Sequence, residues 1–356
     1  MAENIIDTKA GPIASLQSGH WFKLICGASY QSLPDVRNLT LAYVIAGADC
    51  IDMAADLAVI NSAKDGLAAA EKLLRCSPDW QARQYRRPLL LVSVSAGEDP
   101  HFRKAWFDSA RCPADCPRPC EQVCPAAAID FTGVVRDRCY GCGRCLPICP
   151  LGLIEAQQIP TTVSALASDV LSQVDALEIH THVGGEVAFS QVWELLMPFI
   201  SHLKVISISC PDAEGFTDYL KKLQHIMGFS DISKAPDVEK PVVVWQTDGR
   251  PMSGDIGKGT THAAVQLAKK VLTSDLPGHV QLAGGTNEYT VLKLRKLGLL
   301  SASNEVVVGS RTVSGIAYGS FARRLLMPVI EQTYYLEEVP QALQKAVTLA
   351  DSLIRP

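Results

Sequence analysis

Short apolar runs alternate with amphipathic stretches along most of the chain, and this alternation predicts repeated βα units. The predicted strands cover residues 21–28, 50–54, 88–95, 174–182, 203–209, 241–247, 280–283 and 305–308. The predicted helices cover residues 35–45, 65–74, 187–200, 216–227, 261–273 and 288–297, with more helical pattern to the end, including 339–354. Strands and helices in this order favour an α/β fold, a (β/α)8 barrel of the TIM type.

The alternation breaks between the third and fourth predicted strands. We therefore expect residues 1–107 to form the first part of the barrel, 108–155 an inserted segment, and 156–356 the rest of the barrel and the C-terminal helices. An insertion at this point follows a strand, so it belongs to a loop on the C-terminal face, where barrel active sites form.

Composition narrows the functional classes. The chain has 356 residues, of which 47% are hydrophobic and 20% charged, as in a globular protein. Its net charge of −4 gives no basic field for nucleic acid. Residues 1–7 lack the order of a signal peptide, and no apolar run reaches the length of a membrane span. We expect a cytoplasmic protein that neither binds nucleic acid nor spans a membrane.

Cysteine is concentrated in the insert, which holds eight of the 12 cysteines. Cys139, Cys142, Cys145 and Cys149, with Pro150, form the bacterial ferredoxin run C-x2-C-x2-C-x3-C-P. The short gaps let three thiolates face one [4Fe–4S] cluster, and the fourth cysteine of such a run binds the other cluster. The expected sets are Cys139, Cys142, Cys145 and Cys124 on one cluster, and Cys112, Cys116, Cys120 and Cys149 on the other.

The first cysteine run is irregular, because three residues separate Cys112, Cys116, Cys120 and Cys124. The wider gaps leave open that this cluster is a [3Fe–4S] or labile form, or that one cysteine of the run is not a ligand. Zinc and disulfides are the other interpretations of such cysteines. Two runs of four, each ending in Cys-Pro, favour two iron–sulfur clusters over a zinc site, which needs only four ligands.

Polar residues occupy one face of several predicted strands. In the fourth strand, Glu178 and His180 alternate with apolar residues, and Lys23 and Asp52 have the same phase in the first and second strands. These side chains are expected to point into the barrel. They are candidate acid–base or substrate-binding groups. The alternative is a salt-bridge network that only specifies the core.

Two glycine-bearing segments follow late predicted strands. Gly284 and Gly285 follow the seventh, and Gly309 and Ser310 follow the eighth. Loops at these positions bind phosphate in many barrels, so these four residues are candidate phosphate ligands. Tight βα turns are the simpler interpretation.

The insert, together with residues 174–182 (VDALEIHTH), 246–261 (QTDGRPMSGDIGKGTT) and 281–287 (QLAGGTN), resembles the LdpA family of cyanobacterial light-dependent period proteins. The resemblance extends over essentially the whole chain. It implies an iron–sulfur protein that senses cellular redox state, which stands in for light and feeds into the circadian clock. A clock-input kinase and clock proteins are the implied partners. Only the eight cysteines of the insert are carried over as site residues.

Two functions follow. The first is a redox-sensing regulator whose clusters exchange single electrons with a donor such as ferredoxin or a quinone. The second is an iron–sulfur oxidoreductase with a substrate or cofactor in the mouth of the barrel. No predicted strand is followed by the G-x-G-x-x-G fingerprint of dinucleotide sites. We therefore favour the regulator and leave open whether the protein is an enzyme.

Overall fold

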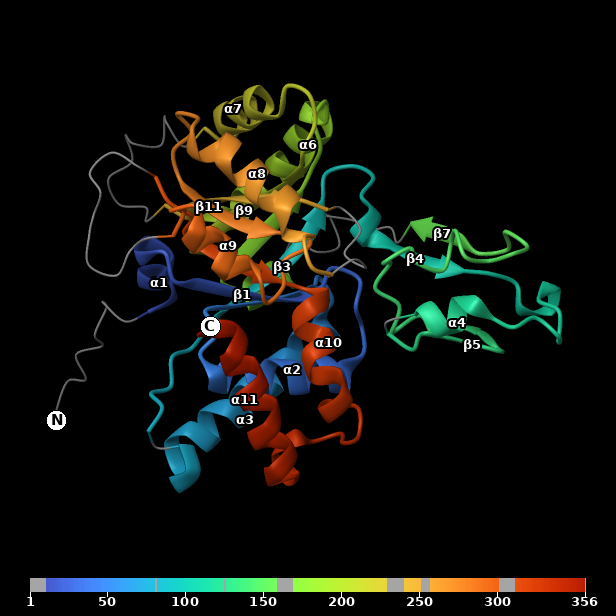
Figure 1. Ribbon diagram of the computed structural model, residues 1–356. Coiled ribbons are helices and arrows are strands. Elements are labelled where there is room, and N and C mark those ends of the chain that lie inside the picture. Colours follow the sequence, from blue (N-terminus) through green and yellow to red (C-terminus); the bar gives the residue numbers. More distant parts are fainter. Residues whose placement is uncertain are drawn as a thin grey trace.

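Eight parallel strands form a closed barrel in which each strand pairs with its neighbours in chain order (Figure 1). The computed structural model describes residues 11–80, 82–124, 126–158, 169–228, 240–250, 257–300 and 311–355. The barrel strands are β1 (Trp21–Gly27), β2 (Cys50–Ala54), β3 (Leu89–Ser95), β8 (Ala176–His180), β9 (Val205–Pro211), β10 (Val242–Asp248), β11 (His279–Ala283) and β12 (Gly315–Tyr318). The predicted (β/α)8 barrel is confirmed.

The prediction of the last barrel strand was wrong. β12 comprises Gly315–Tyr318 and pairs with β1 and β11, whereas the predicted strand at 305–308 lies outside the described residues. The three valines at 306–308 have high strand propensity, which is why the sequence pattern favoured that segment. At Gly315 a Cβ atom would lie 2.4 Å from the carbonyl oxygen of Trp21, so β12 approaches β1 where only glycine fits.

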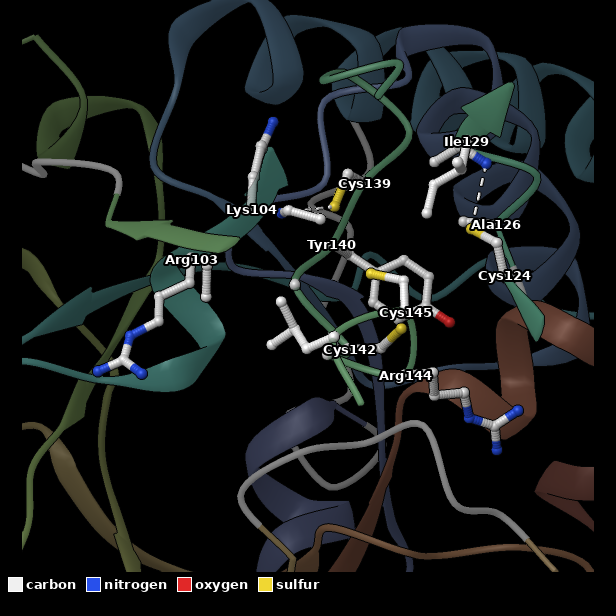
Figure 2. Close-up of a pocket in the computed structure, with 16 residues that line it drawn as sticks. Arg103, Lys104, Cys124, Ala126, Ile129, Cys139, Tyr140, Cys142, Arg144 and Cys145 are labelled. Carbon is white, nitrogen blue, oxygen red and sulfur yellow. Dashed lines mark hydrogen bonds between the residues drawn. The ribbon is translucent and has the colours of Figure 1, made fainter. Parts of the chain in front are cut away.

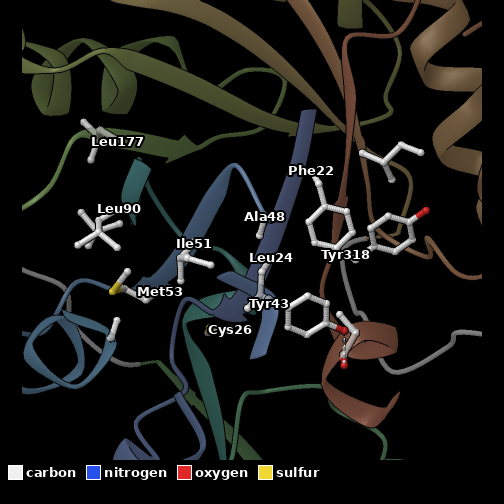
Figure 3. Packing of buried hydrophobic residues seen from close by; sticks show 14 of the residues in the cluster. Phe22, Leu24, Cys26, Tyr43, Ala48, Ile51, Met53, Leu90, Leu177 and Tyr318 are labelled. Carbon is white, nitrogen blue, oxygen red and sulfur yellow. Dashed lines mark hydrogen bonds between the residues drawn. The ribbon is translucent and has the colours of Figure 1, made fainter. Parts of the chain in front are cut away.

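Helices surround the barrel. Their bounds are α1 (Pro12–Ser18), α2 (Leu33–Ala46), α3 (Leu57–Cys76), α6 (Glu186–Leu196), α7 (Phe216–Met227), α8 (Thr261–Leu272), α9 (Thr290–Lys296), α10 (Ser320–Ile330) and α11 (Pro340–Ile354). Helices α2, α3, α10 and α11 gather on one side of the barrel, and α6, α7 and α8 lie on the opposite side (Figure 1). Strand residues such as Leu24 and Ile51 pack against Tyr43 and its neighbours in the main core (Figure 3).

The barrel interior changes from apolar to polar along its axis. Near the strand starts, Trp21, Leu91 and Val244 form a small core that Leu16 of α1 joins. Two residues further along the same strands, the buried residues are polar: Lys23, Ser93 and Gln246. Because side chains alternate along a strand, the same inward phase supplies both layers. The polar layer therefore lies toward the C-terminal face.

The insert projects from the C-terminal side of β3 (Figure 1). Its stem pairs β4 (Arg103–Trp106) with β7 (Glu155–Gln158) in antiparallel register. Beyond the stem lie the short helix α4 (Pro119–Val123) and the hairpin of β5 (Ile129–Asp130) and β6 (Gly133–Val134). A separate small core contains Ala105, Phe107 and Ile154 together with cysteines of the insert. Within the described residues, no helix is long and apolar enough to cross a membrane.

Candidate metal centres and barrel mouth

Four cysteines of the insert surround one cavity. Cys139, Cys142 and Cys145 come from a single loop, and Cys124 lies at the end of α4 (Figure 2). The cavity has a volume of about 60 Å³, and its walls include the backbone of Gly141 and Gly143. Both glycines have a positive φ, 70° and 72°, which lets the loop turn tightly between the thiols. This is one of the two cysteine sets expected from the spacing.

The other four cysteines line a second, smaller cavity of about 10 Å³. They are Cys112, Cys116, Cys120 and Cys149, and Phe107 and Ile154 complete the wall. Cys149 belongs to the ferredoxin run but lies with the first-run cysteines. The structure thus brings together both expected sets in separate places, and all eight thiols are free of disulfides.

The cysteine environments suit iron–sulfur clusters. Backbone N–H groups of Ala105 and Ala128 donate to the Sγ atoms of Cys139 and Cys124 at 3.4 and 3.3 Å. Such donors tune clusters held by thiolates. Burial raises the pKa of the Cys145 thiol to about 12. Since cluster ligands are thiolates, binding at Cys145 must displace a proton.

Cys149 differs from Cys145 in its protonation. Burial acts to raise its pKa, but backbone N–H groups, that of Leu153 foremost, outweigh burial and leave the pKa below its ordinary value. The Leu153 nitrogen lies 3.4 Å from the Cys149 Sγ. A thiolate at Cys149 is therefore stabilised by the fold before any metal binds.

The first cavity adjoins the barrel. Tyr140, which follows Cys139, packs its ring 4.2 Å from the guanidinium of Arg323 in α10 and edge-on against Tyr30. Lys104 of the stem is buried, and its Nζ donates to Gln31 of the barrel and to the carbonyl of Arg136 in the insert, each at 2.7 Å. The cysteine loop is thus fixed directly against the C-terminal face.

Three of the lumen candidates form one buried ion cluster. The Nζ of Lys23 lies 3.1 Å from Asp52 Oδ2 and 2.5 Å from Glu178 Oε2. Burial alone would lower the pKa of Lys23, but the two carboxylates outweigh it and raise that pKa. Glu178 also accepts from Ser207 and Gln246, at 2.8 and 2.7 Å. The salt-bridge network that the sequence left open is thus present, and an acid–base role for Lys23, Asp52 or Glu178 stays a prediction.

His180 lies at the mouth, above this cluster, with two residues that the sequence did not suggest. Its Nε2 is 3.1 Å from Glu178 Oε1, and its Nδ1 is 3.5 Å from Asp99 Oδ2. Asp99 also lies 2.8 Å from His101 Nδ1, and His101 Nε2 is 3.7 Å from Asp248 Oδ2. Burial opposes the charged form of His180, but Asp99 and then Glu178 raise its pKa well above the ordinary value. The D-x-H spacing just after β3 was the available sequence signal.

The late-loop candidates divide between described and undescribed residues. Gly284 and Gly285 line the mouth cavity and have φ values of 68° and 88°. A Cβ atom on Gly284 would lie 1.9 Å from Asp248 Oδ1, so a carboxylate packs against this loop. Phosphate binding there stays a prediction. Gly309 and Ser310 lie outside the described residues, and the loop after β12 begins instead at Gly319.

Comparison with known proteins identifies the family. The chain is 55% identical over 350 residues to Light dependent period A of Synechococcus elongatus, covering 97% of this chain and 93% of that protein. The chain belongs to the LdpA family. The model of the LdpA Fe-S cluster-binding domain matches residues 112–160, and that of the Light dependent period A C-terminal domain matches 170–356. The family resemblance is thereby confirmed, and the protein is an iron–sulfur protein of the light-dependent period pathway.

Solved structures resemble the chain only distantly. Tryptophan synthase of Mycobacterium tuberculosis aligns with a TM-score of 0.40 and 12% identity, covering 96% of this chain and 93% of that one. A putative dihydrodipicolinate synthetase from Pseudomonas aeruginosa aligns with a TM-score of 0.33 and 9% identity, covering 93% and 83%. Similarity at this level says nothing about the function of this LdpA family member.

Proposed function

We propose that the protein is a redox sensor that relays light-dependent redox state to the circadian clock through two clusters. The first, a [4Fe–4S] cluster, is held by Cys124, Cys139, Cys142 and Cys145. The second is held by Cys112, Cys116, Cys120 and Cys149 and is either [4Fe–4S] or [3Fe–4S]. When bound, the clusters supply one-electron transfer with a donor such as ferredoxin or a quinone.

The contact of Tyr140 with Arg323 is the observation that carries this proposal. Tyr140 stands between two cluster cysteines, and Arg323 belongs to the barrel helix α10. Arg323 also donates to the carbonyl oxygens of Ile25 and Cys26, at 2.8 and 2.9 Å. A change in charge beside Tyr140 therefore acts on a residue that links the insert to β1.

A change in the redox state of the clusters would alter the binding of partner proteins. Lys104 and Tyr140 hold the insert against the barrel, so weaker or tighter contacts there change the surface that the two parts offer together. A clock-input kinase and clock proteins are the proposed partners.

The test replaces one ligand and compares it with a cysteine outside the insert. In Cys142→Ser the first cluster is lost, whereas Cys76→Ser changes an exposed cysteine at the end of α3 and keeps both clusters. Iron, sulfide and EPR signals are measured anaerobically, and kinase binding is measured with oxidised and reduced protein. We expect about eight irons per chain in the wild type, or about seven with one [3Fe–4S] cluster. A redox response of kinase binding that survives in Cys142→Ser would refute the proposal.

The cavity at the barrel mouth favours a second function, an iron–sulfur oxidoreductase. Its walls include Asp52, Glu178 and His180 from the barrel and Tyr140 from the cysteine loop. A substrate there would sit beside the first cluster. Mass spectrometry of the purified protein distinguishes the two functions, because a tightly bound organic cofactor or substrate supports the enzyme and its absence supports the sensor.

A further inference from the structure

Two imidazoles and a carboxylate meet at the barrel mouth. Asp99 and His101 lie in the loop after β3, and His180 ends β8. One ligand atom from each of the three residues lies within 4.8 Å of the other two. None of the three belongs to the cysteine clusters. Two histidines with one carboxylate are a common ligand set for a divalent transition metal with open positions.

The distances fit an ion with these ligands. Metal–nitrogen and metal–oxygen bonds of about 2.1 Å place neighbouring ligand atoms about 3.0 Å apart in an octahedron and about 3.4 Å apart in a tetrahedron. Asp99 Oδ1 lies 2.8 Å from His101 Nδ1, and Asp99 Oδ2 lies 3.5 Å from His180 Nδ1. The third pair, His101 and His180, has ring centroids 5.0 Å apart, and binding one ion draws its ligand nitrogens together from a spacing of up to 4.8 Å.

Each imidazole has a carboxylate near its other nitrogen, within hydrogen-bond distance for His180 only. The second ring nitrogen of His180, Nε2, lies 3.1 Å from Glu178 Oε1, and that of His101 lies 3.7 Å from Asp248 Oδ2. Histidines that bind metal usually direct the other nitrogen to a carboxylate, which fixes the ring and raises its basicity. The mouth therefore supplies outer partners as well as ligands.

Asp248 is a further buried carboxylate in this cavity. It is 95% buried, since its exposed fraction is 5%, and its Oδ1 has no hydrogen-bond partner among the described residues. It lines the same cavity as His101 and His180, which has a volume of about 60 Å³. A buried carboxylate oxygen without a partner is costly.

The mouth is rich in carboxylates. Four carboxylates surround the mouth and the layer below it, those of Asp52, Asp99, Glu178 and Asp248. Lys23 is held by Asp52 and Glu178, and the guanidinium of Arg323 is directed to backbone carbonyls and Tyr140. Asp99 and Asp248 face the two histidines instead.

We propose that Asp99, His101 and His180 bind one divalent transition-metal ion at the barrel mouth, in addition to the iron–sulfur clusters. The proposal does not rest on redox sensing, because the three ligands are not cluster ligands. Borderline ions such as Zn²⁺ and Fe²⁺ suit its nitrogen and oxygen donors. Two of the three residues, His101 and His180, line the cavity shared with Tyr140.

The test measures metal binding to protein whose clusters are intact. Cluster-loaded protein is titrated anaerobically with Zn²⁺ and, separately, with Mn²⁺, which thiolates bind poorly. Bound metal is counted by elemental analysis, and Mn²⁺ is also followed by EPR. The variants are His101→Ala and Asp99→Asn, both at partly exposed side chains. His182→Ala is the matched control, since His182 is an exposed histidine two residues beyond His180.

We expect one Zn²⁺ per wild-type chain beyond the cluster iron, and the same in His182→Ala. Loss of an outer partner of a metal ligand already weakens affinity about 10- to 100-fold, so loss of His101 or Asp99 should weaken it at least tenfold. Cluster iron stays constant in all variants, which separates this result from failure of the redox-sensor proposal. If neither ion binds stoichiometrically to the wild type, or if His101→Ala binds as tightly, the site is an ion-pair network without metal.

Discussion

Replacing Lys23 with methionine tests whether the buried ion cluster holds the barrel together. Methionine fills much of the same volume but removes the cation between Asp52 and Glu178. Coulomb's law at an effective dielectric constant of 20 gives about 5 kcal/mol for the 3.1 Å contact and about 7 kcal/mol for the 2.5 Å contact. The desolvation of Lys23 offsets much of this attraction. The net loss on removing one member of a buried ion pair is about 3–5 kcal/mol.

The stability loss in Lys23→Met should depend on pH, and the pKa of Glu178 determines in which direction. In the wild type, burial would raise the pKa of Glu178, but Lys23 and His180 keep it below its ordinary value. That stabilisation is present above the unfolded pKa of Glu178 and is lost as pH falls through the folded one. In Lys23→Met the folded pKa values of both carboxylates rise. The free-energy deficit of the variant should therefore be largest near neutral pH and shrink toward pH about 5.

Urea unfolding followed by circular dichroism measures this deficit on cluster-loaded protein. Lys222→Met is the control, because Lys222 pairs with Glu186 at 2.9 Å but is 64% exposed, and an exposed ion pair contributes little to stability. A loss below about 1 kcal/mol in Lys23→Met, or a deficit equal at both pH values, would show that the cluster is not a net stabilising element.

Two further changes test the junction and the mouth. Arg323→Leu should cost about 2–4 kcal/mol, because it removes hydrogen bonds to the carbonyls of Ile25 and Cys26 and frees Tyr140. Leucine at the exposed neighbour Arg324 should change the stability little. Unfolding and the rate of proteolysis within the insert measure both effects. Gly284→Ala should lower the melting temperature more than Gly298→Ala. Both glycines have positive φ, but only at Gly284 does the new Cβ meet other atoms, and equal losses would mean that strain alone matters.

Local patterns were sufficient to predict most of the barrel. The inward phase of Glu178 and His180 follows from strict alternation in β8, and it was readable because every second residue is polar. The two cysteine sets followed from spacing, since the ferredoxin run places its fourth cysteine away from the first three. Both inferences depend on residues close together in the chain.

What the sequence did not predict depends on contacts between distant residues. β12 is a short segment whose place is set by its contacts with Trp21 and β11. Its sequence is less typical of a strand than the valines at 306–308, so the pattern pointed to the valines. Asp99 and His101 lie where the alternation breaks, so no periodicity indicated their direction. Their meeting with His180 arises only when β3 and β8 pair side by side.

The same pairing explains why the cysteine loop and the barrel mouth share a boundary. Between β3 and the first cysteine, Asp99 and His101 face His180, and four residues later the Ala105 N–H donates to Cys139. A displacement of this short segment moves both contacts. The proposed metal ion would fix one end of the segment and the first cluster the other, since each supplies bonds far stronger than a single hydrogen bond. In the proposed sensor, a displacement at the first cluster would therefore reach the barrel mouth through this one segment.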